Sequence, residues 1–311
     1  MYKKIAGLVA VLTLLAGCGW AKPLVPASPP TLTIEENAVV ERNIDQPGHY
    51  EFNDRIGKAV LEKRAQWRNL PHPLRVDNVD AANAVLAKFG YKLVAQPSGN
   101  GFAFHKGDAV VLESLIDFTA ITTSENGKEF AFVSSQPGKG GILVRNGKAE
   151  PWEVGAHGFL PPLFVGNDFV ELQMLDEKFA VLKNGREVYR GATGPVAVEL
   201  PLKGLHAWNG KWAVEVKGDV IIEGKSQKHE WDYDELFGWH LLNGKPFFFF
   251  RDAGQYGLSY DGQDQGARYD EIVHYKCCEP AMFNPSGNGT MVWFYARKGE
   301  MWHYVEAGIY K

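Results

Sequence analysis

Ala180-Val-Leu-Lys-Asn-Gly-Arg-Glu-Val188 contains the pattern on which the fold depends. An apolar segment runs into Asn184-Gly185, and a second short segment follows at once. Asn-Gly suits the two-residue turn of an antiparallel hairpin, because both positions take a positive φ that these residues tolerate. This stretch therefore predicts two strands joined by a tight turn.

Similar units centre on Gly107, Gly147, Gly224 and Gly262. Together with Gly185 they follow one another at intervals of 40, 38, 39 and 38 residues. A fixed period of this length is typical of repeat architectures, in which each unit buries its apolar face against the next.

A second series of turns lies between the first. Its members, each followed by a β-rich segment, are Asn126-Gly127, Gly166-Asn167, Asn209-Gly210, Asn243-Gly244 and Asn288-Gly289. Each period of about 38–40 residues therefore holds two hairpins, or four strands, which is the content of one propeller blade. Residues 91–311 then give close to six blades. We expect a mainly β fold, a six-bladed β-propeller; the alternative is another repeat-built antiparallel β domain or a β-sandwich.

The last blade is expected to need a strand from the other end of the chain. The period places the turn after Gly262 near residue 300, where Lys298-Gly299 stands, whereas aligning the Asn-Gly series places it at Gly308 and requires an insertion, which Lys276–Ser286 supplies. The chain then ends before the outer strand of that blade. Unpaired sheet edges invite aggregation. We therefore predict that Thr31–Val40, within an N-terminal strand region at 31–52, pairs beside Tyr304 and closes the propeller.

Residues 53–90 are predicted to be a short two-helix segment. Asp54–Trp67 holds good helix formers, and Ala82, Val85, Leu86 and Phe89 follow the spacing of one helix face. Gly90 stands where a helix is expected to stop. No helix is expected from Tyr91 onward.

The N-terminus has the layout of an export signal. Lys3 and Lys4 precede the apolar run Ile5–Leu15, which is too short to span a bilayer. Leu15-Ala16-Gly17-Cys18 follows and resembles the bacterial lipobox. The resemblance implies that residues 1–17 are cleaved, that Cys18 carries diacylglycerol and palmitate-type chains, and that residues 18–30 form a Pro-rich tether. Gly19 in place of Asp implies the outer membrane in a Gram-negative cell, and otherwise the outer face of the cell membrane.

The charge excludes some partners. Without Lys3 and Lys4, 31 basic residues stand against 37 acidic ones, a net charge near −6. A mildly acidic chain without a basic stripe is a poor nucleic-acid binder. No nucleotide-binding glycine loop or nucleophile elbow is present, and no cofactor is expected. The expected partners are the membrane, through the lipid, and an envelope protein or glycan.

One stretch resembles a known repeat family. Gln255–Tyr275 contains Tyr256-Gly257, a strand, an Asp-Gly turn and Tyr-Asp-Glu-Ile, and Trp231–Leu236 repeats the last element. This pattern resembles WG-repeat units. The resemblance implies a binding or scaffold module and transfers no catalytic residues.

Cys277 and Cys278 are adjacent and would share an oxidising compartment. They are disulfide candidates whose strained ring would be easily reduced. The bond would face a ligand, act as a redox switch or merely stiffen a loop; alternatively, both thiols stay reduced. His274 and His303 make a soft-metal site a minor alternative, and no metal site is predicted.

The favoured function is a membrane-anchored binding or scaffold module. Its ligand would be a protein, a peptide or an envelope glycan, bound where loops gather at the propeller centre. The binding candidates are Trp239, His240, His274 and Tyr275.

Two alternatives remain open. A purely structural envelope component is one, and an envelope glycan hydrolase is the other. Enzyme activity is the less favoured interpretation. A hydrolase would need two facing carboxyl groups. Its acids would come from Asp232, Asp234, Glu235, Asp270 and Glu271.

Overall fold

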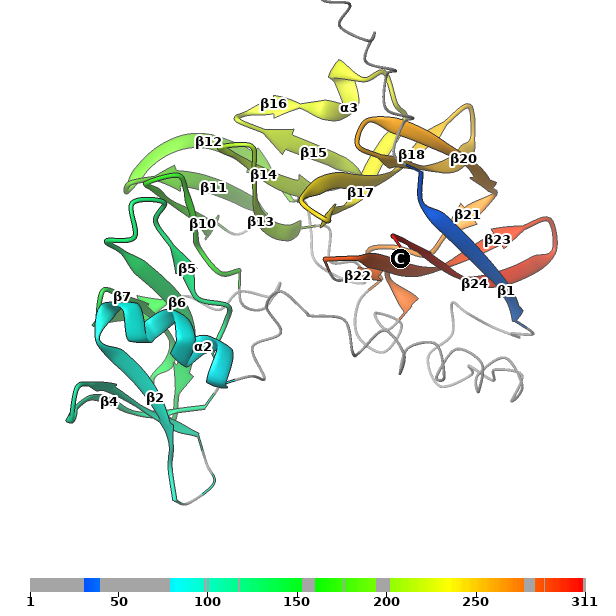
Figure 1. Ribbon diagram of the computed structural model, residues 1–311. Coiled ribbons are helices and arrows are strands. Elements are labelled where there is room, and N and C mark those ends of the chain that lie inside the picture. The colour runs from blue at the N-terminus through cyan, green and yellow to red at the C-terminus, as the bar shows by residue number, and fades with distance from the viewer. Residues whose placement is uncertain are drawn as a thin grey trace, which may run out of the picture.

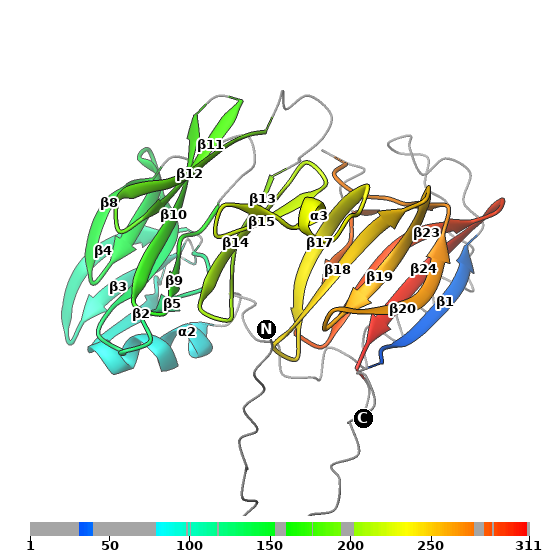
Figure 2. The ribbon, with the colours of Figure 1, turned by 90° about the horizontal axis from the view of Figure 1, so that it is seen from above.

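The computed structural model describes residues 31–39, 79–97, 99, 101–116, 118–152, 160–175, 177–193, 202–276, 283–287 and 289–309. These residues are mainly β and form six antiparallel sheets. The sheets follow one another in chain order along an arc (Figure 1). The view from above shows the same succession, from β2–β4 at one side to β23, β24 and β1 at the other (Figure 2).

The strands are as follows. The first sheet has β2 (Tyr91–Ala95), β3 (Phe102–Lys106) and β4 (Ala109–Leu115). The second has β5 (Thr122–Thr123), β6 (Phe130–Gln136), β7 (Gly140–Arg145) and β8 (Lys148–Trp152). The third has β9 (Leu163–Val165), β10 (Asp168–Leu175), β11 (Lys178–Lys183) and β12 (Arg186–Ala192).

The fourth sheet has β13 (Leu202–Trp208), β14 (Lys211–Val216), β15 (Asp219–Ile222) and β16 (Lys225–Ser226). The fifth has β17 (Glu235–Leu242), β18 (Lys245–Asp252), β19 (Gln255–Tyr260) and β20 (Gln263–Tyr269). The sixth has β21 (Glu271–Ile272), β22 (Ser286–Gly287), β23 (Met291–Lys298), β24 (Met301–Gly308) and β1 (Thr33–Val39).

The turn predicted at Gly308 was wrong, because Gly308 lies in a strand that ends there and the last hairpin turns between Lys298 and Met301. The Asn-Gly turns at Asn184 and Asn243 do have the geometry that their sequence predicts. Asn184 and Gly185 take φ values of 52° and 76°, and Asn243 and Gly244 take 50° and 75°. Positive φ at both central residues matches the right-handed twist of the flanking strands. Lys183 accordingly lies opposite Arg186, so the strands of this hairpin pair directly from the turn.

The residue before the turn glycine also ties the third strand of a sheet to the second. Its side-chain oxygen accepts a hydrogen bond from the backbone N–H of the first or second residue of the second strand. The pairs are Asn146 with Phe130 (2.9 Å), Asn184 with Phe169 (2.9 Å) and Glu223 with Trp212 (3.0 Å).

In the fifth sheet Asp261 occupies this turn position, but the strand residue is Pro246, which has no N–H. The backbone N–H of Asp261 still donates to the Pro246 carbonyl, at 2.8 Å. The freed carboxylate instead accepts from the Lys245 ammonium, at 2.5 Å. At this turn an ion pair therefore replaces the hydrogen bond to the backbone N–H that the other sheets have.

The sixth sheet joins both ends of the described chain. β1 runs antiparallel to β24 as the outermost strand, with Asn37 opposite Tyr304. Glu36 accepts hydrogen bonds from the Tyr269 hydroxyl (2.8 Å) and the Lys298 ammonium (2.5 Å). The N-terminal strand is thus held by its ladder and by side chains of β20 and β23.

The first sheet has three strands, and a helix lies against the edge of β2. Helix α2 (Val79–Leu86) is followed by the 3-10 turn η1 (Ala87–Phe89), and Gly90 ends it with a φ of 77°. The Asn83 amide accepts from the Leu93 N–H (2.7 Å) and donates to the Leu93 carbonyl (2.9 Å). One side chain therefore satisfies backbone groups that a neighbouring strand would satisfy.

The helix predictions have mixed outcomes. The helix predicted around Ala82 to Phe89 corresponds to α2 and η1, whereas Asp54–Trp67 lies outside the described residues. The expectation of no helix after Tyr91 was wrong, because α3 (Gln227–Glu230) forms one short turn. Ser226 caps it by accepting a hydrogen bond from the His229 N–H. Among the described residues, no helix has the length and apolar character needed to cross a membrane.

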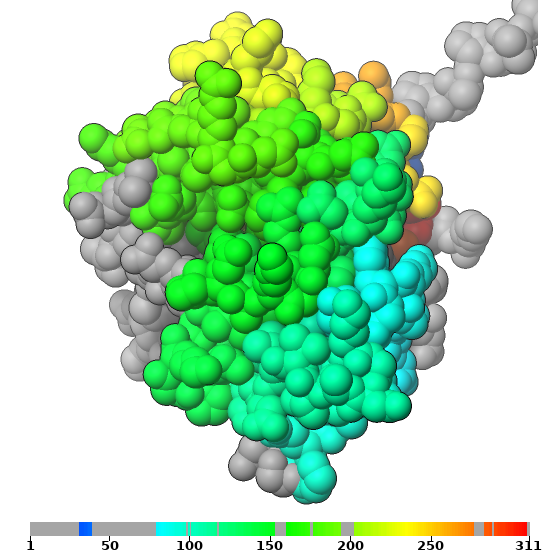
Figure 3. Space-filling model, turned by 90° about the vertical axis from the view of Figure 1, so that its left-hand side faces the viewer, coloured from blue at the N-terminus to red at the C-terminus, as the bar shows by residue number. Residues whose placement is uncertain are grey.

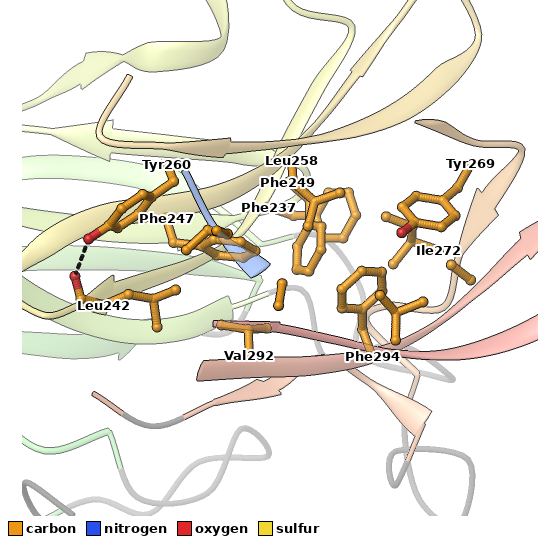
Figure 4. Close-up of a cluster of buried hydrophobic side chains, with 14 of the residues drawn as sticks. Phe237, Leu242, Phe247, Phe249, Leu258, Tyr260, Tyr269, Ile272, Val292 and Phe294 are labelled. Carbon is orange, nitrogen blue, oxygen red and sulfur yellow. Dashed lines mark hydrogen bonds between the residues drawn. The ribbon is translucent and has the colours of Figure 1, made fainter. Parts of the chain in front are cut away.

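The core is divided into clusters that join successive sheets. A separate set of buried apolar side chains lies between each sheet and the next in chain order, from the first and second sheets to the fifth and sixth. Between the last two sheets, the rings of Phe237 and Phe249 stack with their centres 5.2 Å apart. The ring of Phe249 meets that of Phe294 edge to face, with 4.7 Å between the centres (Figure 4). In a space-filling view, the first sheet packs against the neighbouring part of the chain that holds the second (Figure 3). Each sheet is therefore stabilised mainly by its neighbours.

We expect Phe249→Ala to lower the free energy of unfolding by about 3–5 kcal/mol, because it opens a cavity between the fifth and sixth sheets. Phe249 is fully buried. Urea denaturation measures the change. Val110→Ala, at a side chain 49% exposed, is the control and should change stability by less than about 0.5 kcal/mol. A loss below about 1 kcal/mol for Phe249→Ala would contradict the interface.

Candidate functional site

The first strands of the fourth and fifth sheets, β13 and β17, and the segment after β21 meet at a pocket of about 170 Å³. The four binding candidates from the sequence all line it. The lining residues are Lys203, His206, Glu215, Phe237, Gly238, Trp239, His240, His274, Tyr275 and Pro285. The structure thus brings the predicted residues together, although they come from two different sheets.

A bulge in β17 directs these side chains. The register shifts between Phe237 and His240, so Gly238 and Trp239 occupy an extra position in the strand. Gly238 has a φ of 64°, and a Cβ there would lie 2.5 Å from the Phe249 ring, so only glycine fits. Trp239 packs into the cluster between the fourth and fifth sheets, while His240 lines the pocket.

Trp239 therefore has a largely structural role. Its side chain is 1% exposed, lies parallel to Phe248 at 5.9 Å and meets Trp208 edge to face at 5.8 Å. Its backbone N–H donates to Glu215 Oε2 at 2.8 Å. The indole supports the pocket wall from behind.

Tyr275 connects the sixth sheet to the fourth. It follows β21 with a φ of 56°, and its hydroxyl accepts a hydrogen bond from the Gly218 N–H at 3.0 Å. Burial raises the pKa of Tyr275 well above its usual value, and the nearby Glu215 carboxylate raises it further. The phenol therefore stays protonated and holds the inner segments of two sheets together.

His206 and His240 lie on the pocket wall in the neutral state. Burial lowers the pKa of His206 to about 4. Burial, with added repulsion from His206 and Lys203, lowers the pKa of His240 to about 3. Within the described part of the chain, neither imidazole has a hydrogen-bond partner. Their ring nitrogens therefore keep a donor and an acceptor each for another molecule.

Lys203 adds a cation to the same wall. Its ammonium lies 5.4 Å from the centre of the Tyr275 ring. Burial lowers its pKa, and attraction to Glu215 partly offsets that effect. The described residues supply no hydrogen-bond acceptor to this ammonium. The pocket thus presents three polar groups whose hydrogen-bonding capacity is unused.

A second pocket of about 280 Å³ adjoins the first through His274 and Tyr275, which line both. His274 stacks on Phe237 at 3.9 Å, its Nε2 lies 3.0 Å from Glu235 Oε1, and its Nδ1 lies 2.6 Å from the Ile272 carbonyl. With both nitrogens engaged, His274 is held rigidly between the two pockets.

The acids proposed for a hydrolase do not converge. Asp232, Asp234 and Asp270 are exposed, and the Asp270 carboxylate accepts from the Gly299 N–H at 2.6 Å. Only Glu235 and Glu271 line the second pocket. Strand ends and turns separate the other three acids from this pocket, although all five are close in sequence.

The two remaining carboxylates are already paired. Glu271 binds Arg297 at 3.2 Å. Burial raises the pKa of Glu235, but the His274 hydrogen bond and the charges of His274 and Arg251 outweigh it and leave that pKa below its usual value. A glycosidase pairs an ionised carboxylate with a carboxylic acid whose pKa is raised, so that it stays protonated. The lowered pKa of Glu235 does not fit the role of that acid.

The sequence prediction missed Lys203, His206 and Glu215. Glu215 had a signal, since a charged residue stands within the apolar run Trp212–Val216, and its carboxylate is 2% exposed. His206 had a weaker signal: like His240, it is a polar residue in the first strand of its sheet. The residues Cys18, Cys277 and Cys278 lie outside the described part of the chain. Among the described residues, no cluster of three or more His, Cys, Asp or Glu side chains forms a metal site.

We expect His240→Gln to reduce the acid sensitivity of the fold. The pKa of His240 is lower in the folded chain than its unfolded value of about 6.5, so the unfolded chain takes up the proton first and stability falls as pH drops from about 6.5 toward 3. Between pH 7 and 5 the free energy of unfolding should fall by about 1–2 kcal/mol less in the variant than in the wild type. Urea midpoints measured across this range test it. His229→Gln, at an exposed position on α3, should leave the wild-type pH profile unchanged, and equal profiles for all three proteins would contradict the assignment.

No protein-family model and no curated protein matches the chain. Similar solved structures include BBS1N in complex with ARL6DN (8% identity, 70% of this chain and 74% of that one, TM-score 0.30). TolB from Acinetobacter baumannii is similar at 13% identity, over 85% of this chain and 72% of that one, with a TM-score of 0.31. The AfRom2 CNH domain is similar at 8% identity, over 70% and 94%, with a TM-score of 0.23. Similarity this weak assigns neither a family nor a function.

Proposed function

We propose that the protein is an exported lipoprotein that acts as a non-enzymatic binding module, with its ligand site in the pocket between β13, β17 and the segment after β21. The observation that carries this proposal is the set of unused polar groups on Lys203, His206 and His240. Lys203 is exposed and the two histidines are half-buried, so these groups are open to a ligand, and pairing with them in a partly desolvated pocket would favour its binding. The ligand is a peptide, a protein segment or an envelope glycan.

A six-bladed propeller is the architecture we propose for the body. Six antiparallel sheets in chain order, and a last sheet that combines β1 with β24, support it. In such an arrangement the first strand of each sheet lies nearest the central axis, and binding sites form there by convergence of neighbouring sheets. The pocket is lined by such strands.

Binding fits the site better than hydrolysis does. The pocket holds neutral imidazoles, one ammonium and a mostly apolar wall. Its one carboxylate, Glu215, already accepts a backbone hydrogen bond. These groups orient and desolvate a ligand, and they include no nucleophile paired with a general base.

The proposed location at the membrane is based on Leu15-Ala16-Gly17-Cys18. β1 begins at Thr33, so 14 residues lie between its start and Cys18, the proposed site of the lipid. A chain of that length reaches at most roughly 50 Å when fully extended. The tether thus keeps the body close to the membrane, and acyl chains on Cys18 would hold it there.

We expect Cys18→Ser to move the protein from the membrane fraction to the soluble fraction, because the variant lacks the acyl anchor. Fractionation of cells after a high-salt wash, with immunodetection, measures this. Cys277→Ser is the matched control and should stay in the membrane fraction. Retention of Cys18→Ser in washed membranes would rule out a lipid anchor at this residue.

A variant that fills the pocket tests the binding function. We expect His206→Trp, in the full lipidated protein, to retain at least about tenfold less envelope peptide or glycan than the wild type, because the indole occupies the ligand volume. Affinity capture from solubilised envelope, quantified by mass spectrometry, measures retention. His229→Trp places the same side chain on the exposed α3 helix and should capture as the wild type does. Equal capture by both variants, with both folded by circular dichroism, would move the site elsewhere.

A further inference from the structure

Most of the unused hydrogen-bonding groups in the pocket are donors. The Lys203 ammonium has three N–H groups, and each neutral imidazole of His206 and His240 has one. None of these donors has a hydrogen-bond acceptor in the described residues. Glu215, the carboxylate in the pocket, already accepts the Trp239 N–H at 2.8 Å and lies 2% exposed behind the wall. The unused capacity is therefore dominated by donors that face one small space.

A carboxylate satisfies such a set better than a neutral group does. It offers two oxygens with about four lone pairs, and hydrogen bonds from an ammonium to it are charge-assisted. The Lys203 ammonium supplies the opposite charge at the pocket wall, and Glu215 on the same wall already accepts the Trp239 N–H and is 2% exposed.

The rest of the pocket indicates what the carboxylate is attached to. Phe237, Tyr275 and Pro285 make much of the remaining wall apolar. An apolar side chain next to a carboxylate is the arrangement at the C-terminus of a peptide. A sugar acid would instead bring several hydroxyl groups against this apolar wall, and those groups would lose their hydrogen bonds to water.

We infer that the pocket binds the C-terminal end of a peptide, with the terminal carboxylate accepting hydrogen bonds from Lys203, His206 and His240 and the last side chain packing against Phe237 and Pro285. This inference rests on the proposed function and names its ligand class. A pocket of about 170 Å³ has room for one chain end and excludes a folded domain.

Isothermal titration of the full lipidated protein in detergent tests the inference, with acetyl-Gly-Gly-Leu as the probe. The matched probe is the same peptide with a C-terminal amide, which keeps the shape and removes the charge. We expect the free acid to bind at least about tenfold tighter than the amide at pH 7. Because this comparison uses only the wild-type protein, it does not depend on how any variant folds.

Variants assign the contact to the pocket. Lys203→Gln should weaken free-acid binding by about tenfold or more and weaken amide binding much less. Lys211→Gln, at an exposed lysine of the same sheet, should bind both peptides as the wild type does. Lys203→Arg, which keeps the charge, should retain most of the preference for the acid.

Three results would overturn the inference: equal affinity for acid and amide, undiminished preference for the acid in Lys203→Gln, and tighter binding of glucuronate than of the peptide acid. These outcomes are separable from failure of the proposed function. If His206→Trp loses envelope capture but the peptide acid has no advantage, the pocket binds another class of ligand. If His206→Trp captures normally, the binding site itself is misplaced.

Discussion

Burial of sheet faces against neighbouring sheets is the constraint on which the rest of this structure depends. A small antiparallel sheet has two faces and cannot bury either alone, so Phe249 and Phe294 from successive sheets share one apolar cluster. Repeating that contact from sheet to sheet brings the first strands of successive sheets toward a common region. The pocket between β13 and β17 is a consequence of this packing, because the apolar cluster behind it, in which Trp208 of β13 meets Trp239 of β17, positions the side chains of both strands.

Much of the fold could be predicted because its determinants are local. A pair such as Asn184-Gly185 specifies its turn through the φ values of two residues, and the turn specifies the register of the strands beside it. Repeats of such a unit therefore indicate four-stranded sheets before any long-range contact is known. The short helix α3 escaped prediction because one capping hydrogen bond from Ser226, within a region of strands, is enough to form a single turn. The helix predicted at 54–67 stays a prediction.

The site could be predicted only in part, since it depends on contacts between distant segments. Trp239, His240, His274 and Tyr275 drew attention as polar and aromatic residues near the last repeats, and all four line the pocket. The contribution of Lys203 depends on how the fourth sheet packs against the fifth, which no local pattern encodes. The same holds for the acids of the hydrolase alternative. Asp234 and Glu235 are adjacent in sequence, but Asp234 is exposed and Glu235 is paired with His274.

The position of the pocket follows from departures from the repeat. At the first sheet, α2 and its Asn83 amide occupy the edge of β2. In a four-stranded sheet a further strand would pair there and present its side chains. At the sixth sheet, the chain leaves β21 and turns at Tyr275, whose hydroxyl reaches the backbone of Gly218 in the fourth sheet. That long-range bond holds the segment after β21 beside β17, where His240 lies half-buried. A uniform repeat would give similar shallow surfaces at every sheet junction, whereas these irregular segments close one junction into a site.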